Sequence, residues 1–274
     1  MGRVQLSVVD AFTAVPFAGN PAGVCLTDSS DAAWMQAVAA EMNLSETAFV
    51  DVTTLPRTGE VGLRWFTPTT EVEICGHATL ASAHVLHEAG EVDGPIAFRT
   101  AVGILRADRA GSAISLDFPV DVPVPALPDG PWADEFADAL GVAVVAVARC
   151  RYDVLVEVPS ANDVRALEPD LSALRAASGR GVIVTAPSDG QSPEVDFVSR
   201  FFAPAVGIDE DPVTGSAHCC LAPYWSERVG RPSLVGAQLS RRGGLVGVEV
   251  VGDRVMLRGD AVTVTSGELR VPAP

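Results

Sequence analysis

The sequence predicts two domains of similar construction, each combining short β-strands with helices. A chain of 274 residues is long enough for two domains of ordinary size. Apolar, β-branched runs alternate with two or three helical segments along the chain, which indicates a mixed fold. A motif in the first half also recurs in the second half, which favours an internal duplication.

The first half contains four apolar runs bounded by turn residues, which predict strands at residues 4–12, 22–26, 47–53 and 61–66. Trp34, Val38 and Met42 are spaced by four, as on one face of a helix, and predict a helix over 31–42. A stretch rich in Ala, Leu and His, without interior Gly or Pro, predicts a second helix over 76–89.

The second half follows the same order of elements. Its apolar runs predict strands at 155–159, 181–186 and 195–202, a helix at 215–229 and a hairpin at 246–264. Residues 121–131 hold four Pro and one Gly, which is typical of a linker or an edge segment. We therefore expect an N-terminal domain of residues 1–119, to which 265–274 return, and a C-terminal domain of 120–264.

The repeated motif joins an Arg-aromatic strand to a Gly-opened helix. Arg64-Trp65-Phe66-Thr67-Pro68 is followed by acidic residues and then by Gly76. Arg200-Phe201-Phe202-Ala203-Pro204 is followed in the same way by Gly215. Two such domains are expected to face each other across a ligand cleft.

The composition excludes several classes of function. The formal net charge is -16, so we expect no nucleic-acid partner and no membrane partner, because such a surface repels phosphates and anionic lipids. No segment has the pattern of a signal peptide or the length of a membrane span, which favours a cytoplasmic protein. All 19 basic residues are Arg, so the chain lacks the lysine that anchors pyridoxal phosphate.

The five cysteines are odd in number and scattered, so we expect no disulfide framework. Cys219 and Cys220 lie about one turn inside the predicted helix and are expected to point into the core. His84 and His87 are three residues apart, but no third ligand accompanies them at a zinc-like spacing. For these two and for His218, a core or surface role is preferred to metal binding. QLSRRGG (238–244) is either an anion-binding loop or a hairpin turn.

The two helix starts are candidate anion sites. A helix that begins at a Gly-containing turn leaves backbone N–H groups free, and these donors and the helix dipole attract a carboxylate or a phosphate. Gly76 and Gly215 allow a ligand to approach the backbone, and Ser216 adds a hydroxyl donor. Either Gly alone would more simply permit a tight turn, but their pairing within a repeat favours binding.

These segments resemble the motifs of the PhzF family, which is named for an isomerase of phenazine biosynthesis and shares the diaminopimelate-epimerase fold. The resemblance extends from about residue 4 to about residue 265, with the motifs in the family's order in both halves. It is carried by GNPAGV (19–24), NLSETAF (43–49), FTPTTEVEICGHATLASAHVL (66–86), RFFAP (200–204) and DPVTGSAH (211–218).

The resemblance implies an α+β protein with two similar domains, each a curved, mostly antiparallel sheet wrapped around a central helix. It also implies a homodimer that works without metal or organic cofactor on a small carboxylate substrate. The residues that match the family's site are Glu46, His77 and Asp211 as catalytic groups and Asn20, Ser45, Gly76, Gly215 and Ser216 as substrate-binding groups.

Glu46 is the expected acid/base. A carboxyl group set between a helix and an apolar strand is partly shielded from water and so exchanges protons more readily at neutral pH. His77 would donate to a substrate oxygen or only cap its own helix, and Asp211 would orient a polar group or only hold a turn. Asn20 would equally contact substrate or hold a turn.

Related epimerases on this fold use two cysteine thiols, one at each helix start. Cys75 occupies the first of these positions, but residues 211–215 contain no Cys, which disfavours a two-thiol racemase. A single carboxylate can instead move a proton between two carbons on one face of a substrate. We therefore expect a proton-shift isomerase of secondary metabolism, as for trans-2,3-dihydro-3-hydroxyanthranilate. An epimerase and a non-catalytic binding protein remain the alternatives.

Overall fold

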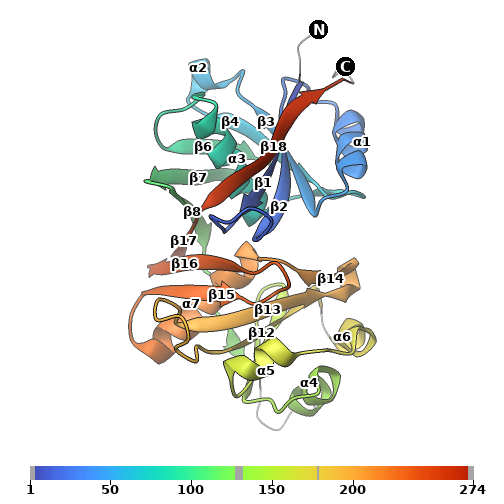
Figure 1. Ribbon diagram of the computed structural model, residues 1–274, viewed down its shortest axis with the longest axis vertical. Coiled ribbons are helices and arrows are strands. Elements are labelled where there is room, and N and C mark those ends of the chain that lie inside the picture. Colours follow the sequence, from blue (N-terminus) through green and yellow to red (C-terminus); the bar gives the residue numbers. More distant parts are fainter. Residues whose placement is uncertain (1–3, 127–131, 178, 271–274) are drawn as a thin grey trace. The chain divides into compact units, whose positions relative to one another are not determined.

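The computed structural model describes residues 4–126, 132–177 and 179–270 (Figure 1). The chain divides into two compact units, of which unit 1 comprises residues 1–117 and 258–274 and unit 2 comprises residues 118–257. The prediction placed these boundaries after residues 119 and 264. The chain leaves unit 1 within one strand, Ala113–Pro119 (β8), and re-enters it within another, Arg254–Gly259 (β17).

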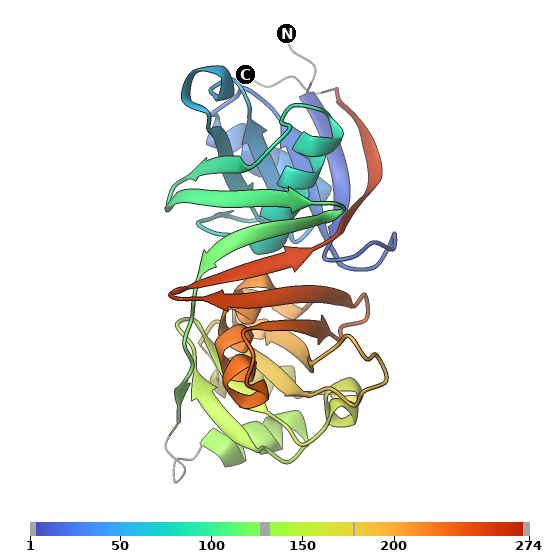
Figure 2. The same cartoon turned by 90° about the vertical axis from the view of Figure 1, so that its left-hand side faces the viewer.

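Unit 1 consists of strands that pack around one buried helix. Its strands and helices are β1 (Val4–Ala11), β2 (Asn20–Leu26), α1 (Ala32–Met42), β3 (Glu46–Asp51), α2 (Leu55–Thr58), β4 (Val61–Phe66), β5 (Glu71–Val72), α3 (Gly76–Glu88), β6 (Ile96–Thr100), β7 (Gly103–Ala110), β8 and β18 (Ala261–Leu269). The strands β6, β7 and β8 form an antiparallel meander, drawn in green in Figure 2.

Unit 2 has the same α+β character. Its elements are β9 (Val124–Pro125), α4 (Trp132–Leu140), β10 (Ala146–Arg149), β11 (Asp153–Glu157), α5 (Ala161–Ala166), α6 (Leu171–Ala177), β12 (Gly181–Pro187), β13 (Phe197–Ala203), the 3-10 turn η1 (Pro204–Val206), β14 (Ile208–Asp211), α7 (Gly215–Val229), β15 (Ser233–Gln238), β16 (Gly244–Val251) and β17.

The observed elements confirm most of those predicted. The strand at 61–66 and the helix at 215–229 have the predicted bounds, and the other predicted helices differ by one residue at an end. The predicted hairpin at 246–264 is the pair β16 and β17, followed at Ala261 by the start of β18. Of the predicted linker at 121–131, residues 124–125 form β9, and residues 127–131 lie outside the described residues.

The strand pairings repeat between the units and support the duplication. In unit 1, β2 is parallel to β3, β3 is antiparallel to β4, β4 is antiparallel to β5 and parallel to β6, and β6 is antiparallel to β7. In unit 2, β11 to β16 pair in the same sequence of directions. The helix α3 lies between β5 and β6 in the chain, and α7 lies between β14 and β15.

The repeated Arg-aromatic motif makes the same contacts in each unit. Arg64 donates Nε and Nη2 to the two carboxylate oxygens of Glu71, at 2.7 and 2.8 Å, and its guanidinium lies 5.1 Å from the ring centre of Phe66. Such a bidentate ion pair fixes the orientation of both side chains. The repeat therefore ties the strand of the motif to the short strand before the buried helix.

The second copy of the motif has the same geometry. Arg200 donates to both oxygens of Glu210 at 2.6 and 3.0 Å, and its guanidinium lies 4.9 Å from the ring centre of Phe202. The agreement in donors, acceptor and aromatic neighbour shows that the similarity in sequence is also a similarity in structure.

The helices α3 and α7 form the centre of their units. Nine residues of α3, from His77 to Leu86, are buried, and they are mostly small: Ala, Ser and Thr. Small side chains let strands approach a helix from several sides, and a helix that is apolar on all sides is buried on all sides. In α7, Trp225 stacks on Phe197 of β13 with ring centres 5.9 Å apart.

One expectation about the cysteines is wrong. The structure joins Cys150, just after β10, to Cys220 of α7 in a disulfide, with their Cα atoms 6.5 Å apart. The two residues are 70 positions apart in the chain, so no local pattern shows that the fold brings them together. Cys219 is buried, as expected, and Cys220 is buried although it is bonded.

Breaking this disulfide will destabilise unit 2. A cross-link that closes a loop of 70 residues removes entropy from the unfolded chain, which corresponds to about 4 kcal/mol. We expect a reducing agent to lower the free energy of unfolding by an amount of this order in denaturant titrations. The double variant Cys150→Ser, Cys220→Ser should show no effect of reductant, and an equal effect of reductant on both proteins would contradict the assignment.

Acid will also destabilise unit 2 through His218. Burial lowers the pKa of this imidazole to about 4, although its hydrogen bond to the Thr214 carbonyl oxygen acts in the opposite direction. The folded state therefore favours the neutral ring, and stability is complete above the unfolded pKa of about 6.5 and falls as the pH drops toward 4. The loss over this interval is about 3 kcal/mol.

The variant His218→Asn tests this contribution, because its amide can still donate to the Thr214 carbonyl oxygen. We expect it to lose less stability than the wild type between pH 6.5 and pH 4 in urea titrations. Equal losses in the two proteins would show that His218 is not the responsible group.

Candidate functional site

The start of α3 brings together Glu46, Cys75 and His77. Strand β3 begins at Glu46 and runs parallel to β2, with Glu46 opposite Ala22. Cys75 is the N-cap residue of α3, in an extended conformation, and His77 lies in the first turn of the helix. The edge of the sheet where β3 begins therefore adjoins the first turn of the helix.

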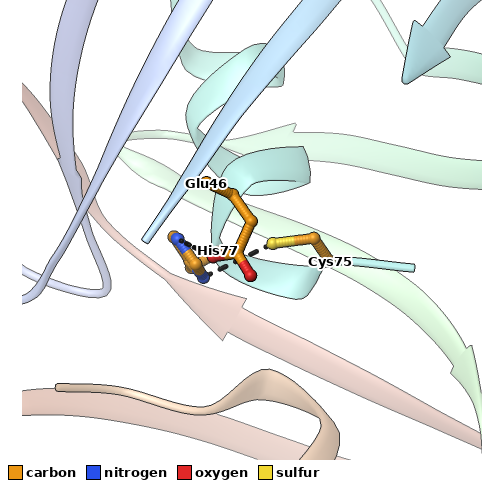
Figure 3. Close-up of side chains that lie close together, drawn as sticks. All are labelled: Glu46, Cys75 and His77. Atoms are coloured by element: carbon orange, nitrogen blue, oxygen red, sulfur yellow. Dashed lines mark hydrogen bonds and ion pairs between the residues drawn. The ribbon is translucent and has the colours of Figure 1, made fainter. Parts of the chain in front are cut away.

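The three side chains point toward one another (Figure 3). His77 Nε2 lies 3.4 Å from Glu46 Oε2, and His77 Nδ1 lies 3.5 Å from Cys75 Sγ. The side chain of His77 is 6% exposed and that of Glu46 is 15% exposed. The carboxylate is thus close to the protein interior but still reachable from outside.

His77 is neutral at physiological pH. Burial lowers the pKa of its imidazole to about 3, because the charged form loses its hydration. Its contact with Glu46 therefore joins a neutral ring to a carboxylate and is not a salt bridge. A neutral imidazole can donate one hydrogen bond and accept another, depending on its tautomer.

The helix starts at α3 and α7 have no side-chain cap. Helices α1 and α5 are capped by Asp31 and Ser160, which accept hydrogen bonds from first-turn N–H groups. Cys75 and Thr214, at the N-caps of α3 and α7, make no such bond. Neither N-cap side chain therefore occupies the first-turn N–H groups of its helix, which is a requirement for an anion site at a helix start.

The other predicted residues of unit 1 lie along the same sheet edge. Asn20 begins β2, two positions before the residue opposite Glu46, and is fully buried. Ser45 immediately precedes Glu46 and is half-buried, and Gly76 is the first residue of α3. The structure thus gathers all five predicted unit 1 residues, Asn20, Ser45, Glu46, Gly76 and His77, around the ends of β2, β3 and α3.

In unit 2, Asp211 supports the start of α7. Its Oδ2 accepts a hydrogen bond of 2.5 Å from the Thr214 hydroxyl. Gln238 of β15 accepts from the Thr214 backbone N–H and donates to the Asp211 carbonyl oxygen. Asp211 is buried, and its hydrogen bonds to Thr214 and Gln238 shape the turn before α7.

The sequence did not point to Arg180, which orders the same turn. Its Nη2 donates to the Ser216 hydroxyl oxygen at 2.9 Å and to Asp153 at 2.5 Å, and its Nε donates to Asp153 at 2.9 Å. Burial acts to lower the pKa of Arg180, but the hydrogen bonds and charge of Asp153 outweigh it, so the pKa is raised. Arg180 therefore brings a permanent positive charge to Ser216.

The remaining candidates have structural contacts. His84 lies 3.2 Å from the Thr263 hydroxyl, and His87 lies 3.0 Å from the Val92 carbonyl oxygen. His218 is fully buried in the core of unit 2. Leu239 to Gly243 join the antiparallel strands β15 and β16, which makes the QLSRRGG segment a hairpin connection.

No helix across residues 4–126, 132–177 and 179–270 has both the length and the apolar composition needed to cross a membrane.

Comparison with known proteins places these features in a family. The chain matches the PhzC-PhzF family model, described as phenazine biosynthesis-like protein, over residues 9–267. An uncharacterized isomerase of Halalkalibacterium halodurans is 49% identical over 272 residues, covering 98% of this chain and 99% of the relative. An uncharacterized isomerase of Pseudomonas aeruginosa is 46% identical over 276 residues, covering 98% and 99%.

The fold agrees with the sequence relationship. A crystal structure of a PhzF family protein from Enterococcus faecalis superposes with a TM-score of 0.88 at 39% identity, covering 98% of this chain and all of the other. The resemblance inferred from the motifs and the α+β fold are confirmed. The chain therefore belongs to the phenazine biosynthesis-like PhzF family and is a PhzF-like isomerase.

Proposed function

We propose that the protein is a cofactor-independent isomerase in which Glu46 moves a proton between two carbons of a small unsaturated carboxylic acid. The observation that carries this proposal is the Glu46 carboxylate, 3.4 Å from a neutral His77, at a helix start whose N-cap side chain makes no capping hydrogen bond. This arrangement combines a base, a hydrogen-bond donor and an anion site within one turn of helix.

The proposed reaction begins when Glu46 removes a proton from a carbon next to the substrate's double bond. The C–H electron pair forms a new double bond, the original double bond shifts, and the electron density moves to the distal carbon. The protonated Glu46 then returns its proton to that distal carbon. One carboxylate on one face of the substrate suffices, and atoms and charge balance without a second base.

The other unit 1 residues would stabilise this path. The N–H groups of the first turn of α3, which have no side-chain cap, would hold the substrate carboxylate, with Gly76 allowing close approach. Neutral His77 would donate to a substrate oxygen where negative charge develops, since its pKa of about 3 keeps it from carrying a charge of its own. Asn20 and Ser45 would bind the substrate beside Glu46.

The substrate class follows from the family. A small amino- or hydroxy-substituted unsaturated acid, such as trans-2,3-dihydro-3-hydroxyanthranilate, would suit this chemistry. The binding roles of Asp211, Gly215 and Ser216 remain predictions, as do a cytoplasmic location, a place in secondary metabolism and a homodimeric assembly. Arg180 supports the role of Ser216, because it places a fixed cation beside that hydroxyl.

A second candidate function is epimerisation, which the position of Cys75 favours. Its sulfur lies 3.5 Å from His77 Nδ1, at the helix start where related epimerases place their first thiol. Cys219, the free cysteine of unit 2, is buried within α7, and burial raises the pKa of its thiol to about 12. A thiol held in its neutral form is a poor second base, which favours the single-carboxylate route.

Replacing Glu46 will remove the proton shift. We expect Glu46→Gln to slow solvent deuterium incorporation into a dienoic acid substrate by about 100-fold or more, measured by NMR, because an amide cannot take up the proton. The exposed Glu41 of α1 provides a matched control, and Glu41→Gln should exchange like the wild type. Exchange by Glu46→Gln at the wild-type rate would refute the proposed mechanism.

Replacing Cys75 will separate the two candidate functions. We expect Cys75→Ala to keep isomerisation within about tenfold of the wild-type rate, since the proposed proton path does not use the thiol. If this variant loses as much activity as Glu46→Gln, the thiol is a catalytic base and the epimerase mechanism gains support.

A further inference from the structure

We propose that Glu46, Cys75 and His77 form a binding site for Zn²⁺, and that bound zinc blocks the isomerase. The three residues offer a thiolate, an imidazole nitrogen and a carboxylate oxygen, which are the donor types that zinc prefers. Catalytic and inhibitory zinc sites need only three protein groups, with water in the fourth position. The inhibitory part of the inference rests on the proposed function of Glu46.

The distances suit a tetrahedral ion. Zinc bonds of about 2.3 Å to sulfur and about 2.0 Å to nitrogen separate these two donors by roughly 3.6 Å. Cys75 Sγ and His77 Nδ1 are 3.5 Å apart, so this edge of the tetrahedron already exists. The donor atoms of all three residues lie within 4.8 Å of one another, so the carboxylate needs to move by only about 1 Å.

His77 is prepared for this role by its burial. Zinc binds an imidazole nitrogen, and the buried ring of His77 holds its Nδ1 3.5 Å from the Cys75 sulfur. With zinc on Nδ1, the proton would reside on Nε2, and Glu46 Oε2, which now lies 3.4 Å from Nε2, would turn to the ion as its third protein ligand.

The negative charges of Glu46 and of the chain as a whole attract a cation to these side chains. Cys75 and His77 are buried, and Glu46 brings a negative charge at 15% exposure. The net charge of the chain is -16, which raises the concentration of cations near the surface. A zinc ion bound to the Glu46 carboxylate would neutralise its charge and occupy its oxygen, so Glu46 could not take up a proton from the substrate.

A second cluster of possible ligands sets a condition for the experiment. Asp121, Cys150 and Cys220 also have donor atoms within 4.8 Å of one another. Their two sulfur atoms are joined in a disulfide, so they offer no thiolate while the protein is oxidised. Zinc binding must therefore be measured without a reducing agent, with the disulfide confirmed by mass spectrometry.

The test is equilibrium dialysis of the full chain against Zn²⁺, comparing wild type with Cys75→Ala and Glu46→Gln. We expect one zinc per wild-type chain, at least 100-fold weaker binding by Cys75→Ala, and at least tenfold weaker binding by Glu46→Gln. Cys25, buried in β2, provides the matched control, and Cys25→Ala should bind like the wild type.

A second readout on the unaltered chain keeps the test independent of variant folding. Co²⁺ should bind in place of zinc and give the intense thiolate-to-cobalt absorption band. Wild-type binding below one zinc per chain, a Cys75→Ala chain that binds as tightly as the wild type, or a cobalt complex without the thiolate band would each overturn the site.

Inhibition is measured separately from binding. We expect Zn²⁺ to stop solvent deuterium exchange at the concentration that saturates the dialysis, and a chelator to restore it. Saturating zinc that leaves exchange unchanged would overturn the inhibitory role. A metal-free chain that binds zinc but never exchanges its substrates would instead refute the proposed function while leaving the zinc site established.

Discussion

Each unit of this protein depends on a buried helix whose first turn has no side-chain cap. In α3, Ala, Ser and Thr side chains fill the interior, so strands can pack closely around the helix axis. Cys75, at the N-cap of α3, makes no side-chain hydrogen bond to the first-turn N–H groups. Each unit therefore combines a buried helix with an uncapped N-terminus, which is the positive end of the helix dipole.

The chemistry of the candidate site follows from this arrangement. His77 lies in the first turn of a buried helix, so its ring is enclosed and its pKa falls to about 3. Glu46 begins the strand that flanks the same helix, which places a carboxylate 3.4 Å from a neutral donor. The parallel pairing of β2 with β3 brings Asn20 to that edge as well. The proposed proton-transfer site and the proposed anion-binding site thus share one helix end.

The sequence predicted what local patterns can encode. Gly76 and Gly215 marked both helix starts, and the spacing of Arg64 and Arg200 revealed the duplication before any pairing of strands was known. Contacts between distant segments left no such pattern. Cys150 and Cys220 are 70 residues apart, and Arg180 reaches Asp153 and Ser216 from 27 and 36 residues away. The neutral state of His77 also depends on burial that only the folded chain defines.

The central claim is that one carboxylate both removes and returns the migrating proton. A substrate deuterated at the donor carbon tests this directly, because a single base can carry its deuteron to the distal carbon before exchanging with water. The account predicts that product formed in a single turnover in ordinary water retains part of the label at the distal carbon, on the face from which it was removed. Product with only solvent hydrogen there, or with the label on the opposite face, would contradict it.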